Sequence, residues 1–173
     1  MAICRSNAPP KETSSLWRQK EEAADGEAAN WFSCLNNGPA SDGTGQVFGS
    51  STGFNLPNGA TRSPDVAWVR NERLDALTDE QWHKFLPLCP DFVLELRSPS
   101  DLMRALHKKM EEYRENGAQL GWLLDPASKQ VHIYRPGAAV GIVNDPATLS
   151  GEPLLRGFVL DVPQIWAVME RKR

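Results

Sequence analysis

The apolar run Phe92–Leu96 constrains the fold of this chain most, because a glutamate, Glu95, interrupts it. Five residues of this composition are typical of a buried β-strand. Side chains alternate along a strand, so Glu95 shares a face with Val93 and Arg97, whereas its leucine neighbours face the other way. A carboxylate at a buried position costs free energy unless it is paired or binds a cation. We therefore expect Glu95 to meet a positively charged group.

The segment after this strand predicts a turn and then an amphipathic helix. Ser98–Asp101 has turn-forming residues that could also cap the helix. The helix is expected from about Asp101 to Asn116, and Asn116-Gly117 is a typical helix end. Its apolar residues recur at helical spacing: Leu102, Ala105, Leu106, Met110 and Tyr113. At about 100° per residue, Lys109 lies within this apolar stripe, which gives the helix a second polar group on its buried side.

Several other segments show the patterns of strands. They are Val47–Phe54, Ser63–Val69, Leu120–Asp125, Gln130–Arg135, Val140–Val143 and Gly157–Val162. In the second of them, Asp65 shares a face with Ala67 and Val69. Asn58-Gly59 favours a tight turn ahead of that strand, and the strand ending at Asp125 is expected to form a hairpin with the next.

Three further helical segments are expected. Apolar residues recur at helical spacing within residues 16–35, Thr78 and Gln81 match the capping box of a short helix, and a helical turn is expected around Ile165–Trp166. Residues 1–15 contain few apolar side chains and predict a disordered N-terminus. The remaining residues, 16–173, predict a single domain, because a chain of 173 residues suits one hydrophobic core.

Composition excludes several classes of protein. The formal net charge of -3 provides no general positive field that would hold the chain on nucleic acid, although an enzyme with a locally basic cleft remains possible. The three cysteines lie far apart, which predicts neither disulfides nor a cysteine metal site and favours a reducing, cytoplasmic setting. No apolar run approaches the roughly 18 residues of a membrane span. We therefore expect no membrane segment and no signal peptide.

Asp65, Glu95 and Lys109 are the candidate catalytic residues. If their strands are neighbours, the two carboxylates converge at one edge of the sheet. Two carboxylates and a backbone carbonyl, that of Leu96, suit an octahedral Mg²⁺ or Mn²⁺ ion that keeps several waters. A lysine beside them can orient a metal-bound water and stabilise developing negative charge. This chemistry is that of metal-dependent phosphodiester hydrolysis.

Each of these residues also has a simpler interpretation. Asp65 follows a proline and could be a turn residue. Glu95 could form a structural ion pair with Arg97 or Lys109. A lysine on an apolar stripe can extend its ammonium group to the rim of the core. The three histidines are scattered and predict no zinc site.

Several strings of residues resemble one protein family. They are Ser51-Thr52-Gly53-Phe54, Ser63-Pro64-Asp65, Pro90 to Leu96, Ser98-Pro99-Ser100-Asp101, Lys109-Met110 with Tyr113, and Asn116-Gly117-Ala118 followed by Gly121 to Pro126. Together they are similar to the Uma-type putative restriction endonuclease family of the PD-(D/E)XK nuclease superfamily. The resemblance runs from about Gly45 to Trp166. Residues 1–44 match the family poorly, and Glu21 or Glu22 would have to fill the role of an acidic residue in its first helix.

The resemblance implies an α/β (α+β) fold, a restriction-endonuclease-like mixed β-sheet flanked by helices. It implies that Asp65 and Glu95 are metal ligands. The superfamily's lysine would fall at position 97, where this chain has Arg97, and the family's usual alternative is a lysine on the following helix, which matches Lys109. Arginine cannot act as a base at neutral pH. Arg97 and Asp101 are the candidate substrate-binding residues, with Arg97 contacting phosphate or Glu95, or lying outside the site.

The function expected from these features is a Mg²⁺- or Mn²⁺-dependent DNA endonuclease. A homodimer is plausible, because cutting both strands of a duplex needs two sites. The alternative is a catalytically inactive nuclease-fold protein that acts as a DNA-binding or protein-interaction module, as Arg97 and the net negative charge suggest. A third hypothesis is a chain that needs a partner chain to fold.

Overall fold

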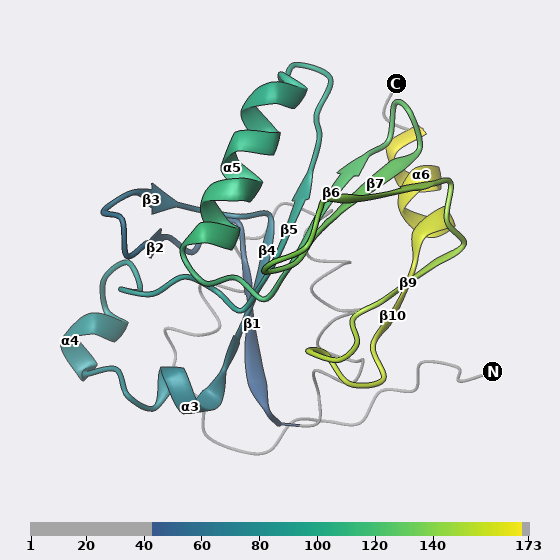
Figure 1. Cartoon of the computed structure of the whole chain (residues 1–173). Helices are drawn as coiled ribbons and strands as arrows, with labels where there is room; N and C mark the ends of the chain where they lie inside the picture. The colour runs from purple at the N-terminus through teal and green to yellow at the C-terminus, as the bar shows by residue number, and fades with distance from the viewer. Residues whose placement is uncertain (1–42, 171–173) are drawn as a thin grey trace.

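A six-stranded mixed β-sheet forms the centre of the computed structural model, which describes residues 43–170 (Figure 1). In spatial order its strands are β1 (Gly45–Gly49), β4 (Val66–Arg70), β5 (Phe92–Leu96), β6 (Leu120–Asp125), β7 (Gln130–Tyr134) and β8 (Gly141–Asn144). Neighbouring strands are antiparallel except β5 and β6, which are parallel. The expected mixed sheet flanked by helices is confirmed. Some expectations lie outside the described residues: the disordered N-terminus 1–15, the helix 16–35, and the candidates Glu21 and Glu22. The single domain stays a prediction.

Four helices and two small hairpins complete this part of the chain. The helices are α3 (Asn71–Leu74), α4 (Asp79–Trp82), α5 (Met103–Glu115) and α6 (Val162–Glu170). The hairpins pair β2 (Phe54–Asn55) with β3 (Thr61–Arg62), and β9 (Thr148–Ser150) with β10 (Val159–Asp161). Parallel strands need a long crossover connection, and α5 makes the one between β5 and β6. Across residues 43–170, no helix has both the length and the apolar content that crossing a membrane requires.

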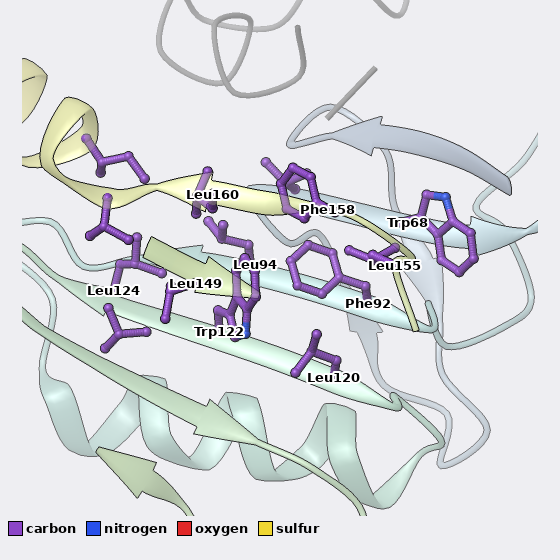
Figure 2. Packing of buried hydrophobic residues seen from close by; sticks show 14 of the residues in the cluster. Trp68, Phe92, Leu94, Leu120, Trp122, Leu124, Leu149, Leu155, Phe158 and Leu160 are labelled. Atoms are coloured by element: carbon purple, nitrogen blue, oxygen red, sulfur yellow. The ribbon is translucent and has the colours of Figure 1, made fainter. Parts of the chain in front are cut away.

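The sheet has one hydrophobic core on each face. In Figure 2, Phe92, Leu94 and Trp122 pack beneath Phe158 and Leu160, on the face that α6 and the β9–β10 hairpin cover. The other core lies under α5. Successive residues of β5 alternate between the two cores, as the strand pattern predicts. Glu95 therefore lies on the α5 face of the sheet.

The sequence predicts most of the larger strands and helices, whose observed bounds differ from the expected ones by a few residues. Helix α5 ends at Glu115, followed by Gly117 with φ of 114°, and Thr78 and Gln81 form the expected capping box at α4. The region around Ile165–Trp166 is a nine-residue helix and thus longer than the single turn expected.

Several expectations about these elements are wrong. The strand expected over residues 47–54 ends at Gly49, where the chain turns and Thr52 N–H donates to the Gly49 carbonyl at 3.0 Å. The Asn58-Gly59 turn closes the separate β2–β3 hairpin. Two members of the predicted apolar stripe, Leu102 and Ala105, are exposed. Leu102 is 76% exposed, because it precedes α5 in an extended conformation with ψ of 116°.

Candidate active site

Asp65 and Glu95 lie opposite each other at one end of strands β4 and β5. The last residue pair of these antiparallel strands is Val66 with Leu94, and Asp65 and Glu95 are the next residues along. Directly opposed residues on one sheet face have Cβ atoms about 5 Å apart. Asp65 is fixed by a 2.7 Å hydrogen bond, in which the backbone N–H of Leu96 donates to its Oδ2. The alternative that Asp65 is merely a turn residue does not account for this bond to the central strand.

Lys109 reaches Glu95 from helix α5. Its Nζ lies 2.7 Å from Oε1 of Glu95, and it also donates to the backbone carbonyl of Ser63 at 3.4 Å. Glu95 is 4% exposed, whereas the lysine side chain is 27% exposed. Asp65, Glu95 and Lys109 thus meet in one place, with the lysine facing both β5 and the segment that leads to Asp65.

Both carboxyl groups resist ionisation in the absence of a further cation. Burial raises the pKa of Glu95 to about 7, the nearby charge of Asp65 adds to this effect, and Lys109 and Tyr113 oppose it. Burial also raises the pKa of Asp65, against the hydrogen bond from Leu96 and the charge of Lys109. When both are ionised, two partly desolvated carboxylates with one lysine near them leave a net negative charge that a cation would offset.

Arg97 lies beside the site but does not pair with Glu95. Its Nη1 is 2.9 Å from Oδ2 of Asp125 on β6, and its Nε donates to the backbone carbonyl of Asp101 at 3.4 Å. Arg97, which occupies the position where the superfamily has its lysine, is therefore held by the carboxylate of Asp125 and not by Glu95. Of the two structural ion pairs considered for Glu95, the structure contains the one with Lys109.

Asp101 closes the loop between β5 and α5. Its Oδ2 accepts hydrogen bonds from the backbone N–H and the hydroxyl of Ser98, at 2.8 and 2.7 Å. These bonds lower the pKa of Asp101. The expectation that this turn supplies the N-cap of α5 is wrong, since Leu102 occupies that position without a side-chain hydrogen bond. Asp101 instead fixes the loop, and its charge acts on both Asp65 and Lys109.

Sequence reasoning missed Tyr113 as a member of this site. It appears in the apolar stripe of the helix as a core residue, and it is indeed fully buried. Its hydroxyl nevertheless donates to Oε1 of Glu95 at 3.2 Å. The available signal was its spacing: Tyr113 follows Lys109 by four residues, so the two share one side of α5.

The oxygen atoms of this site fit the requirements of a Mg²⁺ or Mn²⁺ ion. Within residues 43–170, no cluster of three or more His, Cys, Asp or Glu side chains is arranged to hold a metal. Mg²⁺ needs just one or two protein carboxylates, because it keeps several of its waters. Oδ1 of Asp65 and Oε2 of Glu95 receive no hydrogen bond from this part of the chain. In a strand, the N–H and C=O of one residue point to the same side, so the carbonyl of Leu96 also faces Asp65.

The mixed sheet flanked by helices is a nuclease-like fold. The fold is similar to the crystal structure of a putative nuclease belonging to DUF820 from Anabaena variabilis, with a TM-score of 0.70 and 17% sequence identity over 85% of this chain and 80% of that one. The chain belongs to the Uma2 family, described as putative restriction endonuclease, whose model matches residues 21–163. A search of curated proteins found no match.

Proposed function

We propose that this protein is a Mg²⁺- or Mn²⁺-dependent endonuclease that hydrolyses phosphodiester bonds in DNA. The observation that carries the proposal is the meeting of Asp65, Glu95 and Lys109 at one end of β4 and β5, with the lysine ammonium 2.7 Å from the buried glutamate. Membership of a family described as restriction endonucleases supports DNA as the substrate.

Asp65 and Glu95 would hold the metal ion, together with the backbone carbonyl of Leu96. When bound, the ion supplies a more acidic water and offsets charge on the phosphate. The hydrogen bond from Leu96 N–H fixes Asp65, and the rigid central strand carries Glu95, so both carboxylates are oriented before substrate arrives. Because little covalent chemistry is required of the protein, this orientation is its main contribution.

Lys109 has the electrostatic role in this proposal. Its ammonium group is charged and partly exposed, so it can donate to the attacking water and to a phosphate oxygen as negative charge develops there. Water loses a proton to solvent and adds to phosphorus, the bond between phosphorus and the departing sugar oxygen breaks, and that oxygen takes up a proton from solvent. Arg97 and Asp101 are proposed to act on the substrate. Arg97 would use the part of its guanidinium group that does not contact Asp125, and Asp101 would hold the loop between β5 and α5 in place.

The test is cleavage of supercoiled plasmid DNA in Mg²⁺ by the wild type and by Asp65→Asn, Glu95→Gln and Lys109→Met. Each variant is expected to lose about 100-fold or more in rate, since each removes a group that acts on the transition state. Lys108→Met is the matched control, because Lys108 is the exposed neighbour of Lys109 on the same helix. A double variant, Asp65→Asn with Glu95→Gln, that still cleaves would overturn the proposal. Direct conversion to linear plasmid would support a homodimer with two sites.

The second candidate is a catalytically inactive nuclease-fold protein that binds DNA or another protein. One observation favours it: Lys109 and Tyr113 already satisfy Oε1 of Glu95 without a metal ion. Plasmid that is bound in a gel-shift experiment but stays intact in both Mg²⁺ and Mn²⁺ would favour this candidate. Cleavage that requires Glu95 would exclude it.

A further inference from the structure

Tyr113 makes the second hydrogen bond to the buried glutamate, and we infer that it is a positioning residue that fixes the Glu95 carboxylate for metal binding. The inference rests on the proposed function. The tyrosine side chain is fully buried, and its hydroxyl donates to Oε1 of Glu95 at 3.2 Å. A buried hydroxyl without a partner would lower the stability of the fold, so this bond is not incidental to the packing.

The surroundings of Tyr113 hold it in this position. Its backbone carbonyl accepts hydrogen bonds from Cys89 Sγ at 3.4 Å and from Ala118 N–H at 3.0 Å. The Nζ of Lys109 lies 6.0 Å from the centroid of its ring. Both ends of the residue are therefore fixed. Cys89, which precedes β5, and Ala118, which follows α5, hold its backbone, and Glu95 holds its hydroxyl group.

Tyr113 and Lys109 donate to the same oxygen of Glu95. Oε1 receives both bonds, at 3.2 and 2.7 Å, and Oε2 receives none from residues 43–170. Rotation of the carboxylate about its last bond would break both hydrogen bonds at once. The oxygen left for a cation is consequently set in advance, and it is the one that the two donors leave free.

The chemical nature of the second donor also suits a metal site. A phenol is neutral at physiological pH, and burial together with the adjacent Glu95 raises the pKa of Tyr113 further. A lysine or arginine in its place would bring a second positive charge close to the ion and repel it. A neutral donor holds the carboxylate without that penalty. Groups that hold metal ligands in this way typically contribute about 10–100-fold to metal affinity.

The experiment is a calorimetric titration with Mn²⁺ of the wild type, Tyr113→Phe and Tyr134→Phe. Tyr113→Phe keeps the ring and removes the hydrogen bond, and it is expected to weaken Mn²⁺ binding by about 10-fold. Tyr134→Phe is the matched control. It removes the other tyrosine hydroxyl, which lies 2.5 Å from Nδ1 of His107, a histidine also carried by α5, and it is expected to leave Mn²⁺ affinity unchanged.

The outcomes separate this inference from the proposed function. Wild-type affinity in Tyr113→Phe, or equal loss in both variants, would overturn the inference and leave the proposed function standing. A wild type that binds no Mn²⁺ would overturn both. Loss of affinity confined to Tyr113→Phe would support the inference.

A second measurement needs no substitution and holds even where Tyr113→Phe lowers stability. The chain has two tyrosines, so incorporation of 3-fluorotyrosine gives two ¹⁹F NMR signals. On titration with Mg²⁺, the Tyr113 signal is expected to shift saturably while the Tyr134 signal stays in place. A Tyr113 signal that does not respond while Mg²⁺ binds would contradict a link between this hydroxyl and the metal ligand.

Discussion

Glu95 is the residue whose ionisation opposes folding most directly. Its pKa rises from an ordinary 4.5 to about 7, so the folded state binds this proton more tightly than the unfolded state does. The contribution to stability is therefore full below pH 4.5 and is lost as pH rises to about 7. In EDTA, Glu95→Gln is expected to raise the free energy of unfolding at pH 8, relative to wild type, by roughly 2–3 kcal/mol. Urea denaturation between pH 4.5 and 8 measures the difference.

The difference in unfolding free energy between Glu95→Gln and the wild type is more informative than the pH dependence of the stability of either protein. Burial lowers the pKa of His132, and the charge of the packed His107 ring adds to this effect. The unfolded state then binds the histidine proton more tightly, so this contribution to stability is lost as pH falls below about 6.5. The two effects oppose each other in the wild type. A Glu95→Gln variant whose advantage does not grow with pH would contradict the assigned burial of this carboxylate.

The charged members of the site could be predicted from the sequence, and the neutral one could not. Glu95 stands out in an apolar strand and Lys109 on an apolar helical stripe, because both violate the expected pattern. Tyr113 fits the expected pattern, because a tyrosine in a buried helical stripe is ordinary. The hydrogen-bond partner of its hydroxyl group depends on tertiary structure. The pairing of Arg97 with Asp125 was missed for the same reason, since it joins residues 28 positions apart.

Helix α5 is the element on which the site depends, because it carries both Lys109 and Tyr113. Met110 anchors it: the residue is 1% exposed, and its Cε lies 2.6 Å from where a Cβ on Gly121 of β6 would stand. Met110→Ala is expected to cost about 2–4 kcal/mol through the cavity it leaves, and Gly121→Ala about 1–3 kcal/mol through crowding.

The double variant tests whether these two residues act together. The methyl group of Gly121→Ala would occupy part of the space left by Met110→Ala, so the combined loss is expected to be smaller than the sum. Thermal or urea denaturation of the wild type, the two single variants and the double variant completes the double-mutant cycle. Ala105→Ser, on the exposed side of the helix, is a control that is expected to change stability by less than about 0.5 kcal/mol. Strict additivity would contradict the packing of α5 on β6 through this contact.

Element boundaries could be predicted where local signals act alone. The end of α5 follows from Asn116-Gly117, and the start of α4 from its capping box, because each is set by hydrogen bonds within a few residues. The start of α5 could not be read in this way. Asp101, the apparent cap, uses its carboxylate to close the preceding loop on Ser98, which a pattern of residue types does not distinguish from capping.

At the scale of the whole molecule, the sequence predicts most of the strands and the local hairpin of β6 with β7, but not the pairing of strands that are distant in the chain. The mixed sheet flanked by helices came from the family resemblance and is confirmed. The parallel pairing of β5 and β6 is an observation of the structure. The convergence of Asp65 with Glu95 required β4 and β5 to be adjacent, which was a condition in the sequence argument and is an observation in the structure. Hydrophobic periodicity assigns residues to faces, whereas strand order depends on contacts between segments distant in the chain.

The most direct test of the account is a crystal structure of the protein with Mn²⁺, with anomalous diffraction recorded at the manganese edge. One strong peak is expected between Asp65 and the glutamate of β5, at about 2.1 Å from Oδ1 of Asp65 and from Oε2 of Glu95. Lys109 should lie beside that peak without ligating it. A crystal at saturating Mn²⁺ with no peak at this edge of the sheet, or with a peak remote from both carboxylates, would contradict the account.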